Sequence, residues 1–167
     1  MYRIILLLSL VFVSGTRLAA QSDSTCATIL RLYNTLGAKD KVERNQYKSG
    51  PSSSRPGTIG DVTVYKSSMS IPGFINPEFL EGGGETRRFS TYAETTTYEA
   101  AVKLWDELDK RFHACLNSTW TYKEENNETD LYKSSKVMRD GSFFTPTIRY
   151  RLVRAENKFR LMLEILY

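Results

Sequence analysis

The chain has 167 residues, of which 41% are hydrophobic and 25% are charged, and its formal net charge is +4 at pH 7. These are ordinary globular values, and they exclude a wholly disordered, a collagen-like and a multi-span membrane protein. Residues 1–20 contain two of the 23 basic residues and none of the 19 acidic ones, so the remaining 147 residues carry a net charge of only +2. A basicity this weak, in a chain expected to be exported, argues against nucleic acid as a partner.

Residues 1–20 have the features of a secretory signal peptide. Arg3 supplies a positive start, residues 4–13 are apolar except for Ser9, and small residues lead to a cleavage point after Ala20. Ten residues are too few to cross a hydrocarbon core, which needs about 20. A retained anchor and a buried helix are the alternatives. We expect a signal peptide at 1–20, a single domain at 21–167 with no membrane span, and a secreted or periplasmic location.

The first predicted element of the mature chain is a helix that begins near Ser24 and ends at Gly37. Its apolar residues recur at the spacing of one helix face: Cys26, Ile29, Leu30, Tyr33 and Leu36. Residues 49–60 are rich in Pro, Ser and Gly, which is typical of a surface loop.

The middle of the chain predicts two strands, at 62–70 and 86–94, joined by a long connection over 72–85. The apolar stretch 71–80 contains two prolines. We interpret it either as a flap that closes the core or as a partner-docking loop.

A second helix is predicted after the capping-box pair Thr96 and Glu99. Its apolar stripe consists of Tyr98, Ala101, Trp105, Leu108, Phe112 and Cys115. Cys26 therefore opens one helix and Cys115 closes the other, each on an apolar face, so antiparallel packing of the helices would bring the two cysteines together. We predict a Cys26–Cys115 disulfide, with buried free thiols and a redox or metal role as the alternatives.

The C-terminal part predicts four more strands with short connections, at 116–123, 131–138, 147–154 and 158–167. Short connections imply antiparallel neighbours. The predicted fold class is α+β, with two layers: a mostly antiparallel sheet of about six strands, covered on one face by two helices.

Few residues indicate catalysis. His113 is the only histidine, which excludes a two-histidine metal site, and we expect it on the surface near a helix end. No GxSxG or P-loop motif occurs, and no carboxylate pair is singled out. We predict no catalytic residue, no metal site and no cofactor.

Arginines alternate with aromatic or apolar residues on three of the predicted strands. Arg87, Arg149, Arg151 and Arg160 are the candidate binding face. If their strands are neighbours, these arginines could meet a carboxylate, a phosphate or an acidic protein. A solvated sheet face is the alternative interpretation.

The tetrapeptide Tyr-Lys-Ser-Ser occurs at 65–68 and again at 132–135. Its spacing from the preceding cysteine is 39 residues in the first copy and 17 in the second. This difference favours coincidence over internal duplication.

Several short motifs together resemble small secreted domains of Bacteroidota that have no assigned activity. They are the Ala-Ala-Gln signal junction, Cys26, Gln-Tyr-Lys-Ser-Gly at 46–50, the strand at 64–73 ending in Ile-Pro-Gly, and His-Ala-Cys-Leu at 113–116. The resemblance implies an exported, disulfide-containing α+β domain and assigns no catalytic residue. It would make the glycosylation sequons at Asn117 and Asn127 irrelevant.

The preferred hypothesis is an exported, non-catalytic domain that binds a protein or an anionic envelope component. One version of it is an inhibitor or immunity protein of a secreted enzyme. The competing class is a secreted or periplasmic hydrolase that uses carboxylates.

Overall fold

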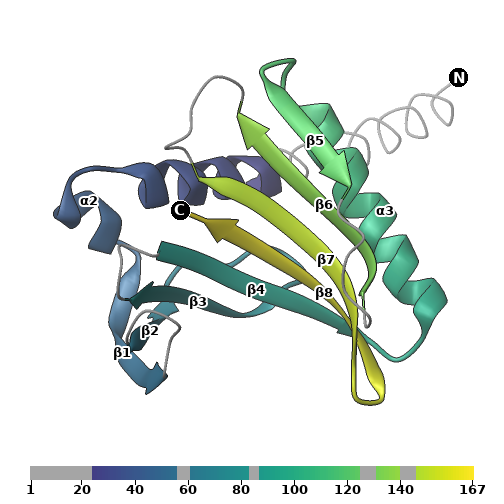
Figure 1. Ribbon diagram of the computed structural model, residues 1–167, viewed down its shortest axis with the longest axis horizontal. Helices are drawn as coiled ribbons and strands as arrows, with labels where there is room; N and C mark the ends of the chain where they lie inside the picture. Colours follow the sequence, from purple (N-terminus) through teal and green to yellow (C-terminus); the bar gives the residue numbers. More distant parts are fainter. Residues whose placement is uncertain (1–23, 56–60, 83–86, 125–130, 140–145) are drawn as a thin grey trace, which may run out of the picture.

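The computed structural model describes residues 24–55, 61–82, 87–124, 131–139 and 146–167 (Figure 1). The predicted signal peptide and the sequon at Asn127 lie outside the described residues. The protein is α+β, with one antiparallel sheet of eight strands in the order β1-β2-β3-β4-β8-β7-β6-β5. The strands are β1 (Lys48–Arg55), β2 (Val62–Ser67), β3 (Ile75–Gly82), β4 (Arg87–Thr95), β5 (Trp120–Glu124), β6 (Leu131–Arg139), β7 (Thr147–Ala155) and β8 (Lys158–Leu166).

Two long helices lie on one face of the sheet (Figure 1). The first helix covers residues 24–37, and α3 covers Tyr98–Cys115. A short helix, α2 (Lys41–Asn45), follows the first helix. The N-cap of α3 is Thr97, whose side chain accepts a hydrogen bond from the backbone N–H of Ala100. The predicted cap was one residue too early, since Thr97 has the extended backbone and the side-chain hydrogen bond of the N-cap.

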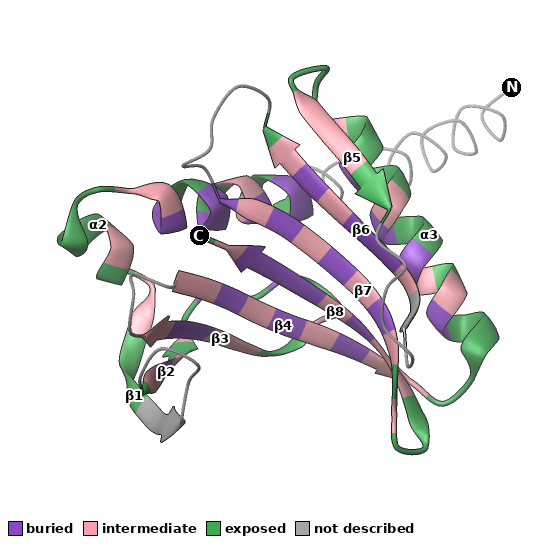
Figure 2. Cartoon of the chain, in the orientation of Figure 1, coloured by how far each residue is buried: buried purple, intermediate pink, exposed green. Residues whose placement is uncertain are grey.

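The core fills the space between the helices and the sheet. Buried and half-buried residues alternate along β4 and β7 (Figure 2). Fully burying each large apolar side chain contributes about 1.5–3 kcal/mol. The predicted stripe on α3 is confirmed at Ala101, Trp105, Leu108 and Phe112. These face a set of fully buried sheet residues that includes Phe79, Phe89, Ile148, Tyr150, Leu152, Leu163 and Ile165.

The disulfide between Cys26 and Cys115 is present, with the two Cα atoms 6.3 Å apart. It joins the start of the first helix to the end of α3, as the apolar positions of both cysteines predicted. Both helices are therefore tied to the same face of the sheet.

The sheet has two strands that were predicted to be loops. β1 occupies most of the stretch expected to be a surface loop, and β3 occupies the connection expected over 72–85. Both contain a proline next to a register shift, Pro51 in β1 and Pro77 in β3. Since proline lacks the N–H that a ladder needs, it is tolerated at bulges and edges, and such strands are hard to recognise from sequence.

The stretch 71–80 was expected to be a core-closing flap or a partner-docking loop, and most of it is instead part of the sheet. Ile71 and Phe79 are buried, Phe74 packs against the core, and the segment from Ile75 onwards forms part of β3. Ile75 is the large apolar side chain of this stretch that remains exposed.

The order of elements repeats along the chain. The first helix precedes β1 to β4, α3 precedes β5 to β8, and the last strands of the two halves, β4 and β8, are neighbours at the centre of the sheet. The two Tyr-Lys-Ser-Ser copies fall on the second strand of each half, β2 and β6. Because Cys26 lies at the start of its helix and Cys115 at the end of α3, and because α2 lies only in the first half, the spacing from the cysteine could not show this equivalence.

We predict that the disulfide contributes substantially to stability, because it closes a loop with a sequence separation of 89. Chain entropy sets an upper value of about 4.5 kcal/mol for such a loop. Replacing both cysteines with serine should lower the free energy of unfolding by about 2–4.5 kcal/mol, measured by urea denaturation. If the double variant unfolds at the same urea concentration as the wild type, the predicted contribution is wrong.

Candidate functional site

The face of the sheet opposite the helices is the candidate site, and we call it the open face. Ile148, Tyr150 and Leu152 point from β7 towards the helices and are fully buried. Since side chains alternate along a strand, Arg149 and Arg151 must lie on the open face. No helix in the described part of the chain covers this face (Figure 1).

A buried carboxylate lies near the centre of the open face. Glu164 on β8 is only 2% exposed, and it breaks the alternation of that strand because Leu163 and Ile165 on either side are also buried. Arg88 on β4 donates to its Oε1 at 3.3 Å, and Arg151 on β7 donates to its Oε2 at 3.0 Å. One carboxylate therefore links the three central strands.

A second ionic cluster lies further along the same face. Glu94 accepts hydrogen bonds from Lys158 at 2.9 Å and from Arg160 Nε at 2.7 Å. These two hydrogen bonds hold the pKa of Glu94 below its ordinary value, and the bond to Glu94 raises the pKa of Arg160. The Arg160 guanidinium also lies 4.8 Å from the ring centroid of Tyr92.

A row of cations crosses the other half of the open face. Lys123 on β5 is directly opposite Lys136 on β6, and Lys136 is directly opposite Arg149 on β7. Arg149 is in turn opposite Glu164 on β8. We call Lys123, Lys136 and Arg149 the basic row.

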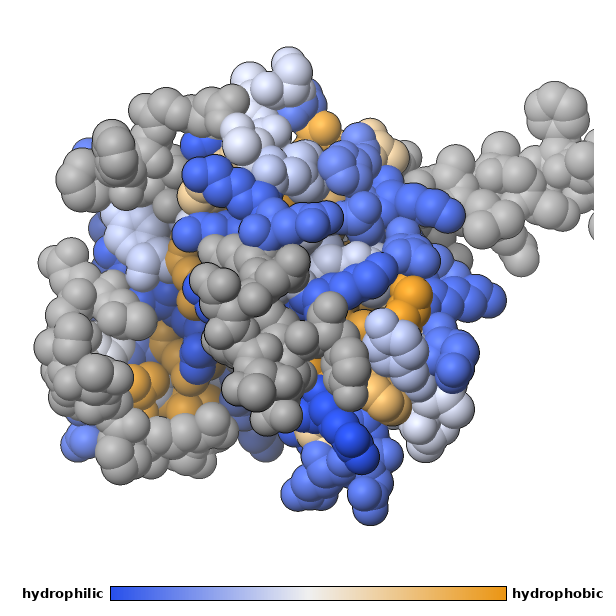
Figure 3. All heavy atoms as spheres, turned by 45° about the vertical axis from the view of Figure 1, so that its right-hand side comes forward, coloured by the Kyte–Doolittle hydropathy of each residue, from blue (hydrophilic) through white to orange (hydrophobic). Residues whose placement is uncertain are grey.

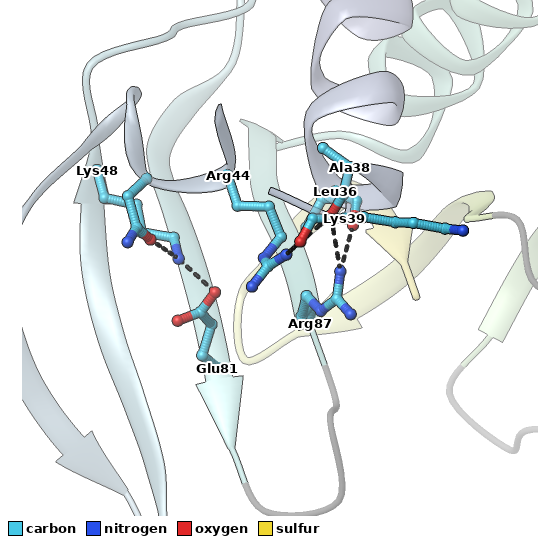
Figure 4. Close-up of polar contacts among 8 residues, drawn as sticks. Leu36, Ala38, Lys39, Arg44, Lys48, Glu81 and Arg87 are labelled. Atoms are coloured by element: carbon cyan, nitrogen blue, oxygen red, sulfur yellow. Dashed lines mark hydrogen bonds and ion pairs between the residues drawn. The ribbon is translucent and has the colours of Figure 1, made fainter. Parts of the chain in front are cut away.

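The structure places three of the four predicted face residues together and separates the fourth. Arg149, Arg151 and Arg160 are on the open face, whereas Arg87 reaches the end of the first helix (Figure 4). Its Nη1 donates to the carbonyl oxygen of Leu36 at 2.9 Å, so it caps orphan carbonyls at the C-terminus of that helix. Arg88, one position later, points to the open face.

The predicted binding face includes Arg87 and omits Arg88, which is the residue that reaches the open face. The strict alternation of β4, in which Phe89 is buried beneath the helices, could have assigned Arg88 to the open face. The basic row was also missed, because Lys123 and Lys136 become neighbours only through strand pairing.

A third group of polar side chains lies beneath α3, on the helix-covered face. The Tyr150 hydroxyl donates to Asp109, and His113 Nε2 is 3.6 Å from the other oxygen of this carboxylate. His113 stacks on Tyr122, with the ring centroids 4.0 Å apart. Burial is the main cause that raises the pKa of both tyrosines, to about 12 for Tyr122, and the charge of Asp109 adds to it.

This group does not form a hydrolytic triad. Asp109 accepts a hydrogen bond from the fully buried Tyr150, and this tyrosine is enclosed by Trp105 and Phe112, whose ring centroids lie 4.6 and 5.1 Å away. A nucleophile must reach a substrate, and this hydroxyl does not. His113 is exposed near the helix end, as predicted.

Neither a protein-family model, a curated protein nor a solved structure matches the chain. Among the described residues, no helix is both long and apolar enough to cross a membrane, and no group of His, Cys, Asp and Glu is placed to hold a metal ion.

We predict that Glu164 supports the open face through its two arginines. Glu164→Gln keeps the shape but leaves Arg88 and Arg151 without their countercharge. Because hydrogen bonds to charged groups contribute about 1.5–3 kcal/mol, the free energy of unfolding should fall by a similar amount. Urea denaturation measures this, with the exposed Glu124→Gln on β5 as the control. Equal stability of the two variants would contradict the support role.

We also predict that stability falls as the pH rises from about 10 to about 12. An unfolded tyrosine ionises near pH 10, whereas Tyr122 in the fold ionises near 12. The unfolded state therefore loses its proton first and is favoured in this window. Tyr122→Phe should flatten the decrease in the urea midpoint over this pH range, while Tyr98→Phe, at an exposed tyrosine, should not. An unchanged slope in Tyr122→Phe would show that Tyr122 titrates normally.

Proposed function

We propose that the protein is an exported, non-catalytic binding domain that recognises an acidic protein through its open face. The observation that carries this proposal is the basic row, in which Lys123, Lys136 and Arg149 are directly opposite one another on three neighbouring strands.

Such a row is unfavourable for the fold itself. Like charges directly opposite each other in an antiparallel pair destabilise it, whereas opposite charges contribute roughly 0.2–1 kcal/mol. Both cross-strand pairs within the row join like charges, and only the adjoining pair, Arg149 with Glu164, joins unlike charges. Acidic groups on a ligand would be attracted to cations gathered in this way, which supports binding at this surface.

The spacing of the row suits an acidic protein surface. Neighbouring strands are about 4.8 Å apart, so the three cations span roughly 10 Å in a line. Carboxylates on one partner surface can match several of these positions at once, and such charge complementarity increases the association rate and the specificity.

The disulfide supports export, because disulfides persist mainly in oxidising compartments. The resemblance to secreted Bacteroidota domains points the same way. The space-filling view in Figure 3 shows mainly hydrophilic side chains among the described atoms, with orange hydrophobic patches that are small and separate. This surface favours a polar interface over an apolar one.

Charge reversal in the basic row tests the proposal. Lys123→Glu with Lys136→Glu should weaken binding to immobilised polyglutamate by at least about tenfold at low salt, because attraction becomes repulsion. The matched control is Lys103→Glu with Lys110→Glu on exposed positions of α3, which changes the net charge equally on the other side of the sheet.

Biolayer interferometry at two salt concentrations measures both variants. Equal loss in the two double variants would show that only net charge matters and would overturn the assignment to the open face. Absence of wild-type binding to polyglutamate, together with binding to phosphatidylglycerol vesicles, would replace the acidic protein with an anionic lipid surface.

A further inference from the structure

A groove of about 410 Å³ lies on the open face, in the half away from Lys123 and Lys136. It is formed by β3, β4, β7 and β8, and its volume falls within the range of about 300–1,000 Å³ that is usual for small-molecule sites. The basic row does not line this groove. It is therefore a second feature of the open face, separate from the surface proposed above.

The charged wall of the groove is cationic and already oriented. Arg88, Arg151 and Arg160 line it, and each donates to a carboxylate of the protein, Glu164 or Glu94. Glu164 also lines the groove, but it is only 2% exposed and both of its oxygens accept hydrogen bonds from arginine. Arginines held in this way lose less side-chain freedom when an anion binds.

The other wall is amphipathic. Met162 and Leu80 provide apolar surface, and Tyr92 carries the Arg160 guanidinium over its ring. Ser90 on β4 lies directly opposite Glu164 on β8 and adds a hydroxyl group to the lining.

A backbone irregularity turns one more polar group towards this site. Asn76 has a φ of 50°, in the left-handed region, and lies at the register shift between β3 and β4. Its Nδ2 donates to the Tyr92 hydroxyl at 2.6 Å, and the Thr91 hydroxyl donates to the Ile75 carbonyl at 2.8 Å. β-Bulges commonly redirect side chains next to binding sites.

We infer that this groove binds a small organic acid. Its carboxylate or phosphate group lies against the arginine wall, and its apolar or aromatic part lies on Met162 and Tyr92. With the groups paired to the lining residues included, four cations (Arg88, Arg151, Lys158 and Arg160) lie with three carboxylates (Glu78, Glu94 and Glu164), and this small positive excess favours an anion. The apolar surface selects an organic acid over a bare inorganic ion.

Calorimetric titration of the full chain with four probes tests this inference. Benzoate and phenyl phosphate combine an acid with a ring, benzamide keeps the ring without the charge, and inorganic phosphate has the charge without the ring. At least one of the two aromatic acids should bind. The affinities of benzamide and of inorganic phosphate should be at least about tenfold lower than that of this acid. Whichever of benzoate and phenyl phosphate binds more tightly shows whether the groove prefers a carboxylate or a phosphate group.

Two variants locate the binding. Arg160→Gln should weaken the aromatic acid about tenfold, and Ser90→Phe, which fills the groove, should abolish binding. Arg154→Gln is the control, because Arg154 is exposed on β7 outside the groove. Circular dichroism checks that each variant is folded.

Three results would overturn the inference: no aromatic acid binds the wild type at about 10 mM, benzamide binds as well as benzoate, or folded Ser90→Phe binds the acid unchanged. The basic-row variant Lys123→Glu with Lys136→Glu should bind the aromatic acid normally. The failure of this inference is thus distinguishable from the failure of the proposed function.

Discussion

Alternation along β7 and β8 is the constraint on which the rest of the structure depends. Leu161, Leu163 and Ile165 are buried beneath the helices, so Arg160, Met162 and Glu164 must occupy the other face. Because both long helices lie on one side, no helix in the described part of the chain covers that other face (Figure 1). Its charged residues are placed there by the packing of their apolar neighbours, and they must be satisfied within the sheet.

The two halves of the open face satisfy this requirement differently. Around Glu164 and Glu94, arginines are paired with carboxylates across neighbouring strands, and the charges nearly balance. Across β5, β6 and β7, cations face cations. A buried ion pair is weak support for stability, since desolvation offsets much of its attraction, and a row of like charges opposes folding. These two arrangements are the basis of the two binding proposals made above.

The helix-covered side provides the stability that such a surface requires. The disulfide ties the first helix to α3, Phe112 of α3 stacks on Tyr150, and Arg87 caps the first helix from β4. None of these interactions involves the open face. Substitutions in the basic row can therefore change binding while the core stays intact, which is what makes the proposed function testable by charge reversal.

The sequence alone was sufficient for the features that depend on local periodicity. It predicted the α+β class, both long helices, the Cys26–Cys115 pairing and six of the strands, because apolar spacing reports directly which face of an element is buried. It failed for β1 and β3, whose prolines are accommodated at bulges that only the neighbouring strands reveal. It also could not separate Arg87 from Arg88 or bring Lys123 next to Lys136. Those relations depend on strand order and register, which are set by packing between residues far apart in the chain, and so only the tertiary structure decides which charges meet.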